Sequence, residues 1–233
     1  MCAFPFVGAI CALFCAVWIL FGTRFCAFFG KTISAHILAL GFTLIPVFVS
    51  GGIHADGFMD TCDALGSHAS RERKLEILKD SHSGAFAVLA CVLYFLSFYV
   101  LSLEFCTQIL RFPFTLRDLL PVLSIFLYSR FLSALSVATF PIAKNSGLVH
   151  TFSSSSAKLF TALFCEIMIF LLSLCLIYFC GRKGIFPLFS SLAVFAIYFA
   201  VSKHNFGGIT GDTAGWFVQL CELAGLMLTV ICL

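Results

Sequence analysis

Long apolar runs recur along this chain, and short polar stretches separate them. A hydrocarbon core of about 30 Å requires about 20 apolar residues per helix, and runs close to that length predict seven membrane-spanning helices. These cover residues 5–23, 32–50, 84–103, 119–140, 159–180, 185–202 and 213–233. The pattern therefore predicts an all-α, polytopic integral membrane bundle, formed as one domain over residues 1–233.

The composition excludes the main soluble classes. Hydrophobic residues make up 61% of the 233 residues and charged residues 11%, whereas soluble domains contain about 45–50% apolar and about 25% charged residues. A soluble globule, a disordered tail and a secreted disulfide scaffold are thereby excluded, and the lipid bilayer becomes the expected partner. A net charge of +3 provides no concentrated basic face for nucleic acid.

The order of the spans predicts which polar segments share a side of the membrane. Segments 51–83, 141–158 and 203–212 each follow an even-numbered span, so all three are expected on one side, where two polar clusters would meet. That side carries seven Lys and Arg residues against six on the other. Because these numbers are nearly equal, the positive-inside rule does not fix the orientation.

Three aspartates in the first polar segment have a helical spacing. Asp56, Asp60 and Asp63 follow i, i+4, i+7, which on a helix places their carboxylates along one stripe. Like charges in a stripe repel, and a bound Mg²⁺ would compensate because it prefers carboxylate oxygens. The alternative is a solvated helix face, which describes Glu72 and Glu76 better because basic residues surround them.

Residues just before this stripe are also candidates for a role in binding or catalysis. Gly51 and Gly52 permit a backbone turn or the close approach of a ligand. His54 is a candidate general base or a hydrogen-bond donor to a phosphate oxygen. The alternative for His54 is an interfacial histidine without a chemical role.

The second polar cluster precedes the last span. Successive glycines before a helix, which include Gly208 and Gly211, are typical of an anion cradle at a helix N-terminus. Asp212 adds a carboxylate beside the first cluster. With Arg71, Arg73, Lys79 and Arg130 as candidate phosphate partners, the two clusters indicate phosphoryl chemistry.

Ionisable residues inside predicted spans need an explanation, because each is costly in the membrane unless it pairs or faces a wet cavity. Arg130 and Glu222 leave two interpretations open, pairing between helices or contact with substrate. Glu166 fits a structural role.

Three motifs resemble those of one family. The sequence GGIHADGFMDTCD at 51–63, followed by LEILKDS at 75–81 and Gly84, resembles the signature of the cobalamin synthase family, the adenosylcobinamide-GDP ribazoletransferases. The sequence GGITGDT at 207–213, with Glu222-Leu223, is similar to its second signature, and Ser129-Arg130 fits its Ser-Arg pair. The matches occur in the family's order, and the resemblance extends over essentially the whole chain.

The resemblance implies an enzyme that joins α-ribazole, or its 5′-phosphate, to adenosylcobinamide-GDP. The products are adenosylcobalamin, or its 5′-phosphate, and GMP, and Mg²⁺ is the cofactor. The implied metal ligands are Asp56, Asp60, Asp63 and Asp212, and the implied catalytic residues are His54, Asp60 and Asp63. The implied substrate-binding residues are Gly51, Gly52, Arg71, Lys79, Arg130, Gly208 and Gly211.

The resemblance also implies a location. Its nucleotide-activated substrate is made in the cytoplasm, so a multi-pass protein of the inner (cytoplasmic) membrane is expected, with its active site facing the cytoplasm. The amino terminus would lie inside and the carboxyl terminus outside, and a homo-oligomer is compatible with this arrangement.

Other membrane proteins with acidic sites fit less well. A CDP-alcohol phosphotransferase is the main alternative, but its Asp-Gly-x-x-Ala-Arg motif is absent. The Asn-Asp-x-x-x-Asp pattern of intramembrane prenyltransferases is not reproduced at 56–63. A transporter would place its carboxylates near the bilayer midplane, whereas these lie at the ends of predicted spans.

Overall fold

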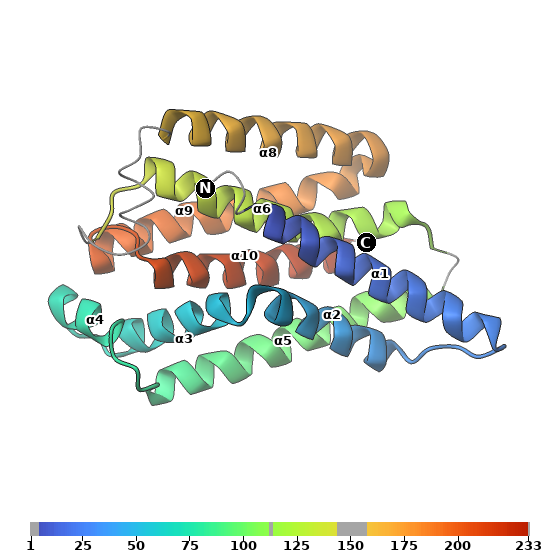
Figure 1. The fold of residues 1–233 in the computed structure, drawn as a ribbon, viewed down its shortest axis with the longest axis horizontal. Coiled ribbons are helices and arrows are strands. Elements are labelled where there is room, and N and C mark those ends of the chain that lie inside the picture. Colours follow the sequence, from blue (N-terminus) through green and yellow to red (C-terminus); the bar gives the residue numbers. More distant parts are fainter. Residues whose placement is uncertain (1–4, 112–113, 144–157, 233) are drawn as a thin grey trace.

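The structure, a computed structural model, describes residues 5–111, 114–143 and 158–232, and almost all of them are helical. The long helices lie lengthwise in one bundle (Figure 1), which confirms the all-α prediction. The predicted loop 141–158 falls outside the described residues from 144 to 157. The elements are α1 (Phe6–Phe28), α2 (Ala35–Ser50), α3 (Ile53–Gly66), α4 (Arg71–Ile77), α5 (Ala85–Arg111), α6 (Leu116–Thr139), α8 (Lys158–Cys180), the 3-10 helix η1 (Gly181–Ile185), α9 (Phe186–Phe206) and α10 (Gly211–Cys232).

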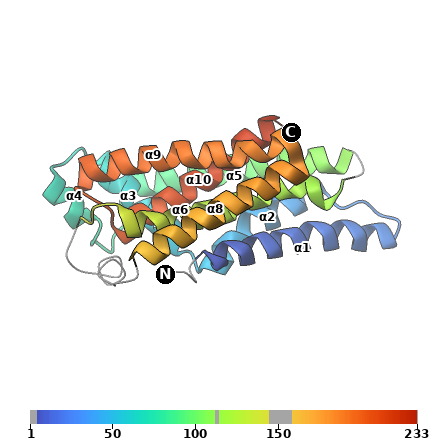
Figure 2. The same ribbon diagram turned by 90° about the horizontal axis from the view of Figure 1, so that it is seen from above.

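Among the described residues, five helical stretches are long and apolar enough to cross a membrane, or six if α2 and α3 together form one bent span. One of the five is the 49-residue stretch Lys158–Phe206, which contains α8, η1 and α9. The chain reverses direction at η1, so that α8 and α9 run in opposite directions (Figures 1 and 2). A multi-pass membrane protein is confirmed, and the number of seven spans stays a prediction.

The helix α6 forms the centre of the bundle. It packs against α1, α8, α9 and α10, and almost its whole length is buried. The surrounding helices turn large apolar side chains outward, among them Phe21 on α1, Leu96 on α5 and Phe170 on α8. Outward apolar side chains on helices whose backbone hydrogen bonds are internal suit a lipid environment.

A sharp break separates α2 from α3, whose axes differ by 91°. Gly51 and Gly52 lie in the left-handed region, with φ of 63° and 79°, which side chains with a Cβ rarely adopt. Their amides donate to the carbonyl groups of Phe48 and Val47 and close the end of α2. The predicted backbone turn at this glycine pair is confirmed.

Two glycines allow α3 to cross α10 in close contact. A Cβ on Gly57 would lie 2.9 Å from the Asp212 backbone, and a Cβ on Gly215 would lie 3.0 Å from the His54 carbonyl oxygen. These distances leave no room for side chains, so the two helix backbones are in contact. The crossing fixes the start of α10 against the first turns of α3.

The polar segments meet at one end of the bundle, as the order of the spans predicts. Ile142, just after α6, forms a parallel bridge with Ile209 before α10. Lys74 on α4 donates to the Asn205 side chain near the end of α9, at 2.7 Å. The described parts of segments 51–83, 141–158 and 203–212 therefore share one end.

Candidate functional site

The three aspartates of the first motif form the predicted stripe on α3. Helix α3 is continuous from Ile53 to Gly66, so residues spaced by four and three share a face. Asp56 is exposed, and Asp60 and Asp63 are half-buried. The opposite face packs into the protein through buried residues that include Phe58, Thr61 and Ala64.

Asp212 joins this stripe from the first turn of α10. Gly57, which lies between Asp56 and Asp60 in the sequence, contacts the Asp212 backbone. The negative charges of Asp56, Asp63 and Asp212 all act on the Asp60 carboxylate. The structure thus brings all four predicted carboxylates into one group, the carboxylate cluster.

Gly84 has a specific place beside this cluster. The Asp63 carboxylate occupies the space that a side chain on Gly84 would take. The glycine that follows the LEILKDS motif is therefore required for Asp63 to lie where it does.

The carboxylate cluster fits a magnesium ion by its chemistry. In the described parts of the chain, no three His, Cys, Asp or Glu side chains are already gathered tightly enough to hold a metal ion. Mg²⁺ seldom uses such a cage, because it is usually bound through one or two carboxylates together with waters and substrate phosphates. Four carboxylates at an open end are a suitable donor set for that mode.

The two glycines predicted to form the anion cradle, Gly208 and Gly211, have different surroundings. Gly208 lies against the backbone of Pro141, Ile142 and Ala143, whereas nothing lies within 4 Å of a Cβ built on Gly211. Thr210 and Thr213 exchange backbone-to-hydroxyl hydrogen bonds of 2.8 and 3.1 Å, which fix the turn. Of the two predicted cradle residues, Gly211 is the exposed one.

Basic side chains reach the same end. The Arg71 guanidinium lies over Gly207, where a side chain would otherwise stand, and both Arg71 and Lys79 are exposed. Lys74 was not predicted from the sequence, yet it is buried and holds Asn205. The sequence feature that indicates its burial is spacing, because Lys74 stands four residues before Leu78 and shares the helical face of that apolar residue.

The Asp80 carboxylate, in the segment between α4 and α5, is held locally. It accepts hydrogen bonds from the His82 backbone amide at 3.0 Å and from the His82 ring at 2.8 Å. These hydrogen bonds lower the pKa of Asp80 below its ordinary value. Asp80 therefore has a partner outside the carboxylate cluster.

His54 does not share the face of α3 that carries the three aspartates. At about 100° per residue, Asp56, Asp60 and Asp63 lie about 180–240° around α3 from His54. The His54 side chain is buried and lines an internal cavity instead. Burial of one face of α3 therefore turns His54 inward and the aspartate stripe outward.

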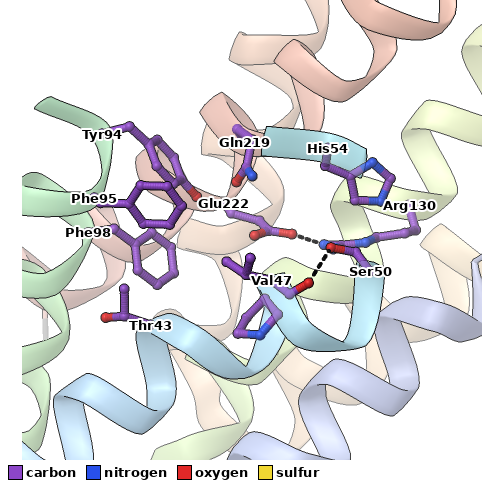
Figure 3. Close-up of a pocket in the computed structure, with 11 residues that line it drawn as sticks. Thr43, Val47, Ser50, His54, Tyr94, Phe95, Phe98, Arg130, Gln219 and Glu222 are labelled. Carbon is purple, nitrogen blue, oxygen red and sulfur yellow. Dashed lines mark hydrogen bonds and ion pairs between the residues drawn. The ribbon is translucent and has the colours of Figure 1, made fainter. Parts of the chain in front are cut away.

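The cavity beside His54 contains the two ionisable residues of the central spans (Figure 3). Arg130 on α6 forms an ion pair with Glu222 on α10, and their side chains are 1% and 2% exposed. Arg130 also donates to the Ser129 hydroxyl at 2.8 Å. Of the two interpretations left open for this pair, the structure has the interhelical pairing, and it does not bring Arg130 to the open end.

The cavity is small and mixed in character. Its volume is about 10 Å³, which suffices for about one water molecule. Its lining comes from α2, α3, α5, α6 and α10, and includes Thr43, Ser50, His54, Tyr94, Arg130, Gln219 and Glu222. It has no room for a nucleotide or a corrinoid.

The fold and the site together define a class: a multi-pass helical membrane protein with a carboxylate cluster and basic side chains at one end. Residues 1–230 match the model of the cobalamin-5-phosphate synthase family. The chain belongs to this family.

Curated relatives agree over nearly the whole chain. The protein named adenosylcobinamide-GDP ribazoletransferase in Lachnoclostridium phytofermentans is 35% identical, over 99% of this chain and 83% of that protein. Proteins of the same name in a Geobacillus species and in Clostridium botulinum are 34% and 32% identical. The alignments cover 94% and 97% of this chain, and 80% and 84% of those proteins. No solved structure matches the chain.

Proposed function

We propose that this protein is an adenosylcobinamide-GDP ribazoletransferase. It joins α-ribazole, or α-ribazole 5′-phosphate, to the cobinamide phosphate and releases GMP. The observation that carries the proposal is the carboxylate cluster, in which the two family motifs meet where α3 crosses α10. The family match over residues 1–230 supports the same reaction. No observation favours the CDP-alcohol phosphotransferase alternative.

The reaction is a displacement at phosphorus. A ribose hydroxyl of α-ribazole attacks the phosphorus that carries cobinamide, and the bond from this phosphorus to the oxygen of GMP breaks. The hydroxyl loses its proton, and GMP leaves with the bonding electrons. Such a transfer depends mainly on positioning and on neutralisation of charge.

The carboxylate cluster is the proposed magnesium site. Asp56, Asp60, Asp63 and Asp212 would hold Mg²⁺, which when bound neutralises charge on the pyrophosphate and on the departing GMP. Gly84 leaves the space in which the Asp63 carboxylate lies, and Gly57 allows Asp212 to approach α3. The backbone thus brings together ligands that are 149 residues apart from Asp63 to Asp212.

Proton removal is assigned to a carboxylate of the cluster. His54 faces the internal cavity, whereas Asp60 lies among the other three carboxylates. We take Asp60 as the group that accepts the proton of the ribazole hydroxyl.

Phosphate recognition is assigned to the exposed groups around the cluster. Arg71, held over Gly207, and Lys79 present positive charge at this end. Gly211 offers an open backbone at the first turn of α10, where helix amides and the helix dipole favour an anion. These groups would hold the GDP part of the substrate.

The proposed location is the inner (cytoplasmic) membrane, with the carboxylate cluster facing the cytoplasm. The activated nucleotide substrate requires access from that compartment. The outward apolar side chains of α1, α5 and α8 support a lipid surround for the remainder of the bundle.

The test is turnover by purified protein in lipid vesicles, with adenosylcobinamide-GDP and α-ribazole, with and without Mg²⁺. We expect equal amounts of GMP and corrinoid product with Mg²⁺ and neither without it. Asp63→Asn, which keeps the shape of the side chain, should lower kcat at least about 100-fold. Glu72→Gln, an exposed carboxylate at the same end but outside the cluster, is the matched control and should remain active. A folded wild-type protein that releases no GMP would contradict the proposal.

A further inference from the structure

A buried polar centre lies behind the carboxylate cluster. It consists of Arg130 on α6, Glu222 and Gln219 on α10, and His54 on α3, all of which line the same small cavity (Figure 3). Each of these four side chains is at most 8% exposed. Ionisable residues inside membrane spans are costly and usually serve function, yet this cavity is too small for a substrate.

One face of α10 connects the polar centre to the crossing with α3. Gly215, Gln219 and Glu222 follow the i, i+4, i+7 spacing and so share a face of α10. Gly215 lies against the His54 backbone, and Gln219 and Glu222 share the cavity with the His54 side chain. The first turn of α3 is therefore seated along this face of α10.

Arg130 fixes the same face of α10 from the other side. Its ion pair holds Glu222 to α6, and Ser129 contributes a second contact to Glu222 at 3.4 Å. Gly225, one turn further on, lies against the Ile125 side chain of α6, so the helices are close at this level. The rotation and height of α10 relative to α6 are thereby set at Glu222.

The carboxylate cluster depends on this placement. Asp212 precedes Glu222 by ten residues, which is about 15 Å along a rigid helix. A shift of α10 at Glu222 would move Asp212 relative to the α3 stripe. The break at Gly51 and Gly52 leaves α3 without a straight helical continuation into α2, so its placement depends on such lateral contacts.

We propose that the Arg130–Glu222 pair, with Gln219 and His54, is a positioning centre that sets α3 against α10 and thereby brings Asp212 to the Asp56, Asp60 and Asp63 stripe. Arg130 and His54 are positioning residues in this assignment, and neither touches substrate. The readout by turnover rests on the proposed function, whereas the placement of α3 has a readout of its own.

The decisive variant replaces both charges by apolar side chains of similar length, Arg130→Met with Glu222→Met. Removing one partner would leave a buried unpaired charge, whereas replacing both with apolar residues is commonly tolerated by a fold. We expect a folded protein whose kcat falls about 100-fold, as for a displacement of about 1 Å in a reacting site. The KM values for both substrates should stay near those of wild type, because the pair lies away from them.

Cysteine labelling reports the placement of α3 without turnover. Cys62 is half-buried on α3 and lies against Trp216 of α10. Reaction with N-ethylmaleimide, resolved at Cys62 by mass spectrometry, should be faster in the double variant than in wild type. The charge-reversed pair, Arg130→Glu with Glu222→Arg, is a second variant that keeps the centre neutral, and it should restore part of both properties.

A matched control alters another buried polar contact of the same helix. Tyr128→Phe removes the 2.9 Å hydrogen bond from α6 to Ser173 on α8. This hydrogen bond is away from α3, so its loss should change neither kcat nor Cys62 labelling.

A folded double variant with wild-type kcat and Cys62 reactivity would overturn the proposal. A raised KM for adenosylcobinamide-GDP with unchanged kcat would overturn it too, since Arg130 would then contact substrate. If the double variant does not fold, the charge-reversed pair decides: changes in kcat and in Cys62 labelling that go together support the proposal, whereas a loss of kcat with wild-type Cys62 labelling would overturn it, because α3 would then still be in place. An inactive wild-type protein would contradict the proposed function, and Cys62 labelling would still decide the positioning role.

Discussion

Glycines at three positions of this protein meet different physical constraints. Gly51 has a left-handed φ and open space around it, Gly57 has an ordinary φ but no space, and Gly211 has neither restriction. The sequence alone does not distinguish these three glycines. Their substitutions should therefore have different consequences.

Gly57→Ala is expected to destabilise the protein through overpacking. The new Cβ would lie 2.9 Å from the Asp212 backbone, so α3 and α10 must separate, at a cost of about 1–3 kcal/mol. Activity should fall as well, because Asp212 moves from the stripe. Thermal unfolding in detergent micelles, together with GMP release, measures both effects. Gly211→Ala is the control and should keep the wild-type unfolding temperature; equal temperatures for both variants would contradict the assigned contact.

Gly51→Val is expected to destabilise through the backbone alone. No atom lies within 4 Å of a Cβ at this position, but a branched side chain at a φ of 63° is strained, by about 1–3 kcal/mol. Gly51→Asn should be milder, because asparagine tolerates the left-handed region. The same unfolding measurement compares the two. A greater loss for Asn than for Val would show that the backbone conformation is not the cause.

At the scale of single residues, the sequence predicted what depends on local spacing. The aspartate stripe follows from a period of 3.6 residues, and α3 has it. The inward direction of His54 depends on which face of α3 packs against α10, and the ion pair of Arg130 depends on a partner 92 residues away. Neither follows from local spacing, because both are set by tertiary packing.

Helix α4 depends on its neighbours, since seven residues are too few for a stable isolated helix. Lys74 holds Asn205 at 2.7 Å. A small core of Ala64, Leu78 and Phe206 joins the end of α4 to α3 and α9. These contacts place Arg71 over Gly207, at the end of the bundle that carries the carboxylate cluster.

Lys74→Met is therefore expected to loosen α4 without unfolding the bundle. It removes the hydrogen bond to Asn205 but keeps the buried aliphatic stem, so amide hydrogen exchange should become faster in peptides that cover residues 70–80 and remain unchanged in α6. Arg73→Gln is the matched control, because its ion pair with Glu76 lies within α4 and is exposed. Equal exchange in Lys74→Met and wild type would exclude the tethering role.

At the scale of elements, helix boundaries were predicted best where polarity changes abruptly. The predicted end at residue 50 coincides with the end of α2. The predicted end at 103 falls eight residues short, because α5 continues to Arg111 through Glu104 and Gln108, which bond to each other on the helix surface. The apolar run from which the span was predicted stops at this polar pair, but the helix continues because a polar pair spaced i, i+4 stabilises a helix.

At the scale of the whole molecule, the sequence predicted which segments meet but not which way they face. The order of apolar runs was sufficient to place 51–83 and 203–212 together, and the Lys74–Asn205 bond and the crossing of α3 with α10 confirm it. The chain carries nearly equal numbers of Lys and Arg on its two predicted sides. The orientation in the membrane must therefore be inferred from the function or measured by a labelling experiment.

The proposed orientation predicts the result of labelling from outside the cell. Ser81→Cys lies in the exposed segment between α4 and α5, and Lys31→Cys lies in the exposed segment between α1 and α2, at the opposite end of the bundle (Figure 1). In a background with the other cysteines replaced, a membrane-impermeant maleimide should label position 31 in intact cells and position 81 only after permeabilisation. The reverse pattern would place the carboxylate cluster outside, away from a nucleotide substrate made in the cytoplasm. It would contradict the orientation and the proposed reaction together, because the site could not then reach adenosylcobinamide-GDP.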